Sequence, residues 1–401
     1  MNYSSHLRNY SNYPLIYIEE YNKEERTVLF DFIDSNQYQT FNTILNFQLS
    51  LEKATMVFLN NYKGRRIQEN TVYALNPEIL NQFSNQVDRN LETNDSFLIG
   101  FEFDCSSITE QIFDHSISQK DLDNIVWTGN KTEDIIFDSN GKIGINVRNV
   151  GHGNWNEISL NNTIKYVFDA GASIHAKKDE ILTIIGNRNK TYPTSKPILI
   201  LSHWDKDHYH SLLGMSDQNL KDNFSSFICR NIVPTLTSRI LFQRLFKSIG
   251  YNNVFTLSAN SFKKGNPIKF KPVNSLKDQV VLYNSTEHKN KNISGLALSV
   301  KAEKGSVILP GDANYDQISR DILCHLNYPH THHLVVPHHG GNAGKYIYKV
   351  PNKVKVDKAI ISFGPNRYKH PTKANLIDLM NSGFYIRKTF KEKKDIKFYL
   401  N

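Results

Sequence analysis

The chain has 401 residues, so we expect one large domain or two smaller ones. Hydrophobic residues make up 39% of the chain and aromatic residues 11%, which excludes global disorder. The three cysteines, Cys105, Cys229 and Cys324, are widely separated and form no CxxC pair, which argues against a disulfide framework and a cysteine-based zinc site. The N-terminus lacks the pattern of a secretory signal and the apolar runs are too short to span a bilayer, so we expect a cytoplasmic protein without membrane association.

The net charge of +9 is unevenly distributed along the chain. Residues 1–140 carry 10 Lys and Arg against 21 Asp and Glu, a net charge of −11, and the remainder has a net charge of +20. This asymmetry predicts two modules, with a boundary close to the turn at Asn140 and Gly141. A basic module attracts polyanions, so nucleic acid is the expected partner, although solvated surface lysines would give the same composition. The acidic module is a candidate to bind a protein partner or to mediate self-assembly.

Residues 1–140 mix strand-like and helix-like segments and contain no catalytic constellation. Apolar runs predict strands at residues 14–20, 26–33 and 96–103, and helical spacing predicts a helix over residues 41–62. These elements predict a separate α+β module.

From residue 141 onward, short apolar strands end in polar or glycine-rich bursts. These segments are IGINVRNVG, EISLNN, IKYVFDAG, PILILS, SVILPGD, HLVVPHHGG and KAIISFG. Helical stretches lie between them, notably residues 235–250, with Thr235 or Thr237 as N-cap and Gly250 at the end. Strands mixed with helices, with polar residues at strand ends, predict a layered α/β domain over residues 141–401 with its site along one sheet edge.

The segment LSHWDKDHYHSL places four potential metal ligands, His203, Asp205, Asp207 and His208, directly after the strand PILILS. Alternate residues of an extended loop face the same way, so the first three can converge while His208 approaches from the following turn. Nitrogen and oxygen donors without thiolates suit zinc or a harder ion such as manganese. The alternative is a solvent-exposed polar exit from the strand.

Two further strand ends carry the same kinds of side chain. Asp312 follows the strand SVILPG, and His338 with His339 follows HHLVVP. Each alone would be read as a strand-terminating turn. Three separate strands that each deliver carboxylates or imidazoles predict a shared metal site.

Together these motifs resemble those of the metallo-β-lactamase-fold hydrolases, and most closely the soluble catalytic domain of ComEC-type DNA-uptake proteins. Six matching segments occur in family order between residues 148 and 371: NVGHGN (149–154), FDAG (168–171), HWDKDH (203–208), GDA (311–313), PHHG (337–340) and RYKHP (367–371). The resemblance implies a four-layer αββα sandwich with two divalent metal ions, zinc or manganese, at the sheet edge.

By position in these motifs, the implied metal ligands are His203, Asp205, Asp207, His208, Asp312 and His338. The first two would hold one ion and the next two the other; Asp312 would bridge them and His338 would complete the second site. His339 is the alternative to His338. His288 lies where many family members carry a further histidine, and a solvated loop is its other interpretation.

The chain also departs from the family pattern. The membrane channel of ComEC proteins is absent, so DNA import is not implied. His152 stands where the family carries Gln; His152 and His175 either line the site or are polar loop residues. His210 is expected to orient a ligand or cap the following helix rather than to bind metal.

The resulting hypothesis is phosphodiester hydrolysis by a metal-bridging hydroxide, with DNA or RNA as substrate. Asp207 and Asp312 would orient the hydroxide, and His370 would contact the phosphate or protonate the leaving oxygen. A structural role ahead of Pro371 is the alternative for His370. The alternatives for the whole protein are a small-molecule phosphodiesterase, another hydrolase of this fold such as one acting on a lactam or thioester, and a binding or regulatory subunit with a vestigial site.

Overall fold

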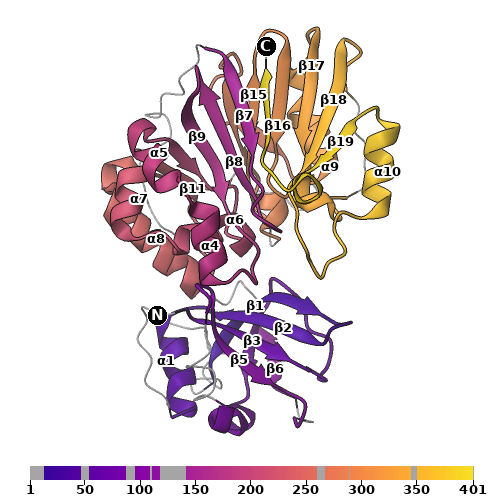
Figure 1. Ribbon diagram of the computed structural model, residues 1–401. Coiled ribbons are helices and arrows are strands. Elements are labelled where there is room, and N and C mark those ends of the chain that lie inside the picture. Colours follow the sequence, from indigo (N-terminus) through magenta and orange to yellow (C-terminus); the bar gives the residue numbers. More distant parts are fainter. Residues whose placement is uncertain are drawn as a thin grey trace. The chain divides into compact units, whose positions relative to one another are not determined.

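The computed structural model describes residues 13–46, 54–86, 95–108, 111–117, 141–259, 267–288, 290–344 and 350–400. The chain divides into two compact units (Figure 1). Unit 1 comprises residues 1–126 and 232–243, and unit 2 comprises residues 127–231 and 244–401. The predicted boundary at Asn140 lies outside the described residues and stays a prediction.

Unit 1 contains a six-stranded sheet in the order β5-β3-β2-β1-β4-β6. The strands are β1 (Leu15–Asn22), β2 (Thr27–Phe32), β3 (Met56–Asn60), β4 (Val72–Leu75), β5 (Ile99–Asp104) and β6 (Phe113–Ile117). The described residues of this unit before residue 126 include the helices α1 (Ser35–Ile44) and α2 (Pro77–Leu80). The Asp34 carboxylate accepts a hydrogen bond from the Gln37 amide and caps α1. Helix α1 buries Tyr38 and Phe41 in a core with sheet residues, as expected for an α+β module.

The helix predicted over residues 41–62 is wrong for part of its length. Helix α1 ends at Ile44, residues 47–53 lie outside the described part of the chain, and β3 begins at Met56. Strand β3 pairs antiparallel with β2 and parallel with β5, and Val57 and Phe58 are buried on its two faces. Pairing and burial on both faces suit β-branched and aromatic side chains and override the helical spacing.

Unit 2 contains two seven-stranded sheets. The first has the order β12-β11-β10-β9-β8-β7-β20. Its strands are β7 (Ile143–Val147), β8 (Trp155–Leu160), β9 (Thr163–Ala170), β10 (Ile198–Ile200), β11 (Ser226–Arg230), β12 (Val254–Leu257) and β20 (Ile396–Leu400). The second has the order β13-β14-β15-β16-β17-β18-β19. Its strands are β13 (Phe270–Pro272), β14 (Val280–Ser285), β15 (Leu296–Lys301), β16 (Gly305–Leu309), β17 (His330–Val335), β18 (Val354–Ile361) and β19 (Tyr385–Lys388).

The two sheets pack face to face, because one buried cluster combines residues of both, among them Ile158 of β8 and Leu298 of β15. Helices contact the outer faces (Figure 1). On the first sheet, α5 (Arg188–Ser195) and α6 (Lys206–Leu213) contact β9, while α4 (Lys178–Ile185) packs on α6 and α7 (Asp217–Asn223) packs on α5. On the second sheet, α9 (Tyr315–Asp321) contacts β13 and α10 (Lys373–Asn381) contacts β19. Helix α11 (Thr389–Glu392) precedes β20. The order helix, sheet, sheet, helix confirms the predicted four-layer αββα sandwich.

The predicted helix over residues 235–250 is confirmed as α8 (Leu236–Ile249). The division between the units falls within it, after Gln243, and Leu236 belongs to the core of unit 1. No helix within the described part of the chain is long and apolar enough to cross a membrane.

The strand order brings the polar bursts together at one end of the sandwich. In the first sheet β9 and β10 are parallel, and in the second β16, β17 and β18 are parallel. Parallel strands present their carboxyl ends at one edge, so the residues that follow them gather there. The topology therefore places all the predicted metal ligands at strand ends of one domain.

Asp31 is a fully buried carboxyl group of unit 1. Its carboxylate accepts hydrogen bonds from the Phe32 amide at 2.8 Å and the Thr237 amide at 3.0 Å. Burial, with a contribution from Glu19, raises the pKa of Asp31 from 3.8 to about 6. The folded unit therefore holds this proton more tightly than the unfolded chain, so the unfolding free energy falls as pH rises from about 4 to about 6.

We expect this loss to reach at most about 3 kcal/mol and to be removed by Asp31→Asn. Hydrogen exchange of the β1 and β2 amides, compared between wild type and variant at matched pH, measures it. A difference between the two proteins that stays constant from pH 4 to pH 7 would contradict the prediction.

Candidate metal centre

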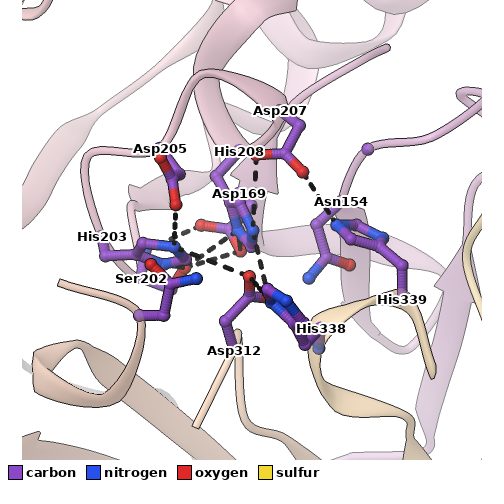
Figure 2. Close-up of polar contacts among 12 residues, drawn as sticks. Asn154, Asp169, Ser202, His203, Asp205, Asp207, His208, Asp312, His338 and His339 are labelled. Carbon is purple, nitrogen blue, oxygen red and sulfur yellow. Dashed lines mark hydrogen bonds and ion pairs between the residues drawn. The ribbon is translucent and has the colours of Figure 1, made fainter. Parts of the chain in front are cut away.

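Asp169, at the end of β9, anchors the start of the HWDKDH segment. It is fully buried, and its backbone has a left-handed φ of 60°. Its carboxylate accepts hydrogen bonds from the Ser202 amide at 2.7 Å, the Ser202 hydroxyl at 2.9 Å and His208 Nδ1 at 2.8 Å. One carboxylate thereby fixes both the exit of β10 and an imidazole of α6 (Figure 2).

These hydrogen bonds also set the tautomers of two histidines. His208 donates from Nδ1 to Asp169, and the Ser202 hydroxyl donates to the same carboxylate. That hydroxyl is then an acceptor for His203 Nδ1, which lies 3.0 Å away. Both imidazoles therefore direct Nε2, the nitrogen left for a ligand, away from these anchors.

The first group of candidate ligands consists of His203, His208 and Asp312, whose donor atoms lie within 4.8 Å of one another. His208 Nε2 lies 3.3 Å from Asp312 Oδ1, and His203 Nε2 lies 3.8 Å from Asp312 Oδ2. All three residues are buried. Figure 2 shows the two imidazoles and the carboxylate pointing toward one another.

The second group consists of His152, Asp207 and His339, again with donor atoms within 4.8 Å of one another. His339 Nδ1 donates to the Ser362 carbonyl at 2.8 Å, and its Nε2 lies 3.0 Å from Asp207 Oδ2. The rings of His152 and His339 are 4.5 Å apart. Asp207 Oδ1 lies 4.0 Å from His208 Nε2, so the two groups are adjacent.

Asp205 lies outside both groups. Its Oδ1 forms an ion pair with Lys291 Nζ at 2.8 Å, and Lys206 Nζ lies 4.0 Å from the same oxygen. Its Oδ2 faces His203 Nε2 at 3.3 Å. Burial raises the pKa of Asp205, but Lys291 and His203 outweigh this effect and hold the pKa well below its ordinary value. Asp205 is thus an ionised neighbour of the first group.

The two adjacent histidines of the PHHG turn occupy different positions. Both have left-handed backbones, with φ of 52° at His338 and 53° at His339. His338 Nδ1 donates to Asp312 Oδ2 at 2.7 Å, and its side chain is partly exposed. His339 is buried and belongs to the second group. The geometry therefore favours His339, the alternative considered from the sequence, as the ligand. His338 instead contacts Asp312.

His370 lies beside these residues without joining either group. Its ring is 5.2 Å from that of His338 and 5.7 Å from that of His152. Burial, with the neighbouring His338, lowers the pKa of His370 to about 4. Gly341 makes room for this ring, because a Cβ there would lie 2.3 Å from His370 Cε1.

The remaining histidines considered from the sequence are not in either group. His210 is buried, and its Nδ1 donates to the Ser173 carbonyl at 2.8 Å, which ties α6 to the loop after β9. Burial lowers the pKa of His175 to about 4. His288 accepts a hydrogen bond from the Asn290 amide at 3.0 Å on Nδ1.

Gly171 permits the close contact between β9 and α6 on which this arrangement depends. A Cβ at this position would lie 1.6 Å from the Asp207 carbonyl oxygen, which no side-chain adjustment can relieve. The glycine of the FDAG turn is therefore needed to bring Asp169 and Asp207 together.

The donor set fits divalent metal ions. His203 Nε2, His208 Nε2 and His152 Nδ1 are buried and lack a hydrogen-bond partner among the described residues. A buried imidazole nitrogen left unsatisfied is costly, and several such atoms facing carboxylates are expected where a cation belongs. Burial lowers the pKa of His208, but Asp312, Asp169 and Asp207 outweigh it and raise the pKa well above its ordinary value. A metal ion bound to His208 would replace the proton that these carboxylates favour on its imidazole.

Two features of the site were not recognised from the sequence. Asp169 was matched only as part of a turn, although a carboxylate directly after an apolar strand is the same signal that identified Asp312. For His152, the sequence does not distinguish a site role from a loop role, because its position depends on ring contacts with residues such as His339, far along the chain.

No family model matches the sequence, and no curated protein matches it. Among solved structures, the chain is similar to CmlA, a diiron β-hydroxylase from Streptomyces venezuelae, with 10% identity and a TM-score of 0.34 over 66% of this chain and 55% of that chain. The short form of human tRNase Z gives 10% identity and a TM-score of 0.31 over 55% of this chain and 93% of that chain. The hydrolase AbOPH of the β-lactamase superfamily gives 12% identity and a TM-score of 0.22, covering 40% of this chain and 56% of that chain.

This chain therefore spans just over half the length of CmlA. The ComEC-type resemblance stays a prediction from the sequence motifs.

Asp169→Asn should weaken metal binding by about 10- to 100-fold. The amide has one acceptor oxygen, whereas the two carboxylate oxygens of Asp169 both accept hydrogen bonds from Ser202 and His208. Titration calorimetry with Zn²⁺ or Mn²⁺ measures the affinity. Asp217→Asn is the matched control, since the Asp217 side chain is 63% exposed on α7, where it forms an ion pair with Arg244. Equal affinities for the two variants would rule out the anchoring role of Asp169.

Metal stoichiometry distinguishes the adjacent histidines. We expect His339→Ala to lower the bound metal from two ions per chain to one, because it removes a member of the second group. His338→Ala should retain both ions, because His338 is in neither group. Elemental analysis after equilibrium dialysis measures both, and the reverse pattern would assign the ligand role to His338.

Proposed function

We propose that this protein is a metal-dependent phosphodiester hydrolase whose substrate is nucleic acid. The supporting observation is that two adjacent groups, each of three imidazole or carboxylate side chains, converge from four strand ends. Several of their buried imidazole nitrogens lack a hydrogen-bond partner among the described residues. The metal-binding residues proposed from this geometry are His203, His208, Asp312, His152, Asp207 and His339. Asp205 and His338, predicted as ligands from the sequence, lie beside the first group, where Asp205 faces His203 and His338 contacts Asp312.

Divalent ions held by these groups would supply Lewis-acid activation of a water molecule and neutralise charge on the phosphate ester. The protein's own groups are arranged to assist. Asp207 Oδ1 faces His208 across 4.0 Å, where it can accept a hydrogen bond from an attacking water. His338 donates to Asp312 and so fixes the orientation of that carboxylate. His370 is proposed to contact the phosphate.

The substrate assignment rests on charge and on the ligand chemistry. Residues 141–401 carry a net charge of +20, which favours a polyanion over a neutral lactam or ester. The divalent ions that this site could hold also suit a phosphate ester, because they would offset the negative charge of the substrate.

The test uses the full chain with bis-p-nitrophenyl phosphate, single- and double-stranded DNA, and RNA, each with Zn²⁺ or Mn²⁺. Asp207→Ala should lower metal-dependent hydrolysis by more than about 100-fold, since it removes a proposed ligand. Asp217→Ala, an exposed carboxylate on α7, should retain activity.

Cleavage of the small ester without cleavage of any polymer would contradict the nuclease assignment. Absence of metal-dependent turnover, together with negligible bound metal, would favour a binding subunit with a vestigial site.

A further inference from the structure

An exposed aromatic ring lies next to the second group of candidate ligands. Tyr368, in the turn between β18 and α10, is 37% exposed. Its ring stacks on His152 with centroids 5.7 Å apart and on His370 with centroids 5.5 Å apart, each at an interplanar angle of 27°. His152 in turn lies 4.5 Å from His339. Aromatic contacts thus run without interruption from the candidate metal centre to the surface.

Folding alone does not account for this arrangement. A tyrosine that remains this exposed contributes less to core burial than the fully buried Tyr166 or Tyr209 of the same unit. A single exposed aromatic is ordinary on a protein surface. An exposed aromatic whose ring is held by two imidazoles of a candidate active site is instead suited to bind a flat substrate group.

The same turn is basic. Residues 364–377 include Arg367, Lys369 and Lys373 and contain no Asp or Glu. Lys369 and Lys373 are exposed. Aromatic and cationic side chains in one short segment match the two chemistries of a nucleotide chain, which alternates flat bases with phosphate anions.

We propose that residues 364–373 form a subsite for single-stranded nucleic acid, in which Tyr368 stacks on a base next to the scissile phosphate. This inference rests on the proposed function and narrows its substrate. Lys369 and Lys373 contact the neighbouring phosphates. Single strands are preferred because a base within a duplex is already stacked on both sides and offers no free face.

Binding can be measured without cleavage. Fluorescence anisotropy of a labelled 12-nucleotide single strand is recorded with the full chain in EDTA. Tyr368→Ala should weaken binding by about 5- to 150-fold, whereas Tyr368→Phe, which keeps the ring, should stay close to wild type. Tyr385→Ala is the matched control, because Tyr385 is 67% exposed on β19 and outside the turn.

An abasic strand of the same length separates stacking from charge. Tyr368→Ala should leave the weaker binding of the abasic strand unchanged, and Lys369→Ala should reduce the salt dependence of binding for both strands. The same pair of strands made of RNA tests whether DNA or RNA is preferred. Equal losses on the normal and abasic strands, or no loss on either, would overturn the proposal.

Hydrolysis of bis-p-nitrophenyl phosphate by the wild type is recorded in parallel. Metal-dependent hydrolysis with no effect of Tyr368→Ala on strand binding removes the subsite and keeps the hydrolase. Base-dependent binding without hydrolysis or bound metal removes the proposed function and leaves Tyr368 as a nucleic-acid contact.

Discussion

The buried carboxylate of Asp169 joins the two strand ends from which the centre is built. It accepts from both the amide and the hydroxyl of Ser202 and from His208 Nδ1, all within one solvent-excluded cluster. Because the Nδ1 atoms of His203 and His208 are occupied by this network, their Nε2 atoms are the ones presented to Asp312. Gly171 makes the network possible by letting β9 approach α6. The proposed chemistry depends on this network, because it places lone pairs where a cation can use them.

Much of unit 2 could be predicted because its physical signals are local. Each of the seven apolar runs predicted as strands from residue 141 onward forms a strand. The parallel strands of both sheets place the polar residues that follow them at one edge. Ligand grouping was not local. The family resemblance implies that Asp207 and His208 share one ion, but their side chains face different partners, since His208 points to Asp312 and Asp207 to His339. Adjacent residues on a helix diverge by about 100°, which explains the separation.

In unit 1, two features depend on contacts between residues that are distant in sequence. Its strands at residues 15–22, 27–32 and 99–104 were expected from apolar runs, but β3 was mistaken for helix because pairing with β2 and β5 decides its conformation. The inclusion of residues 232–243 in this unit had no signal in charge or composition. There the Thr237 amide donates to Asp31, a contact between residues remote in sequence.

A crystal structure of the full chain grown with Mn²⁺, with anomalous differences recorded, tests the dinuclear centre directly. Two peaks are expected, one contacted by His203 Nε2, His208 Nε2 and Asp312 and the other by Asp207 and His339 with His152 alongside. A single peak, or two peaks whose ligands exclude His208 and His339, would contradict the arrangement on which the proposed hydrolase rests.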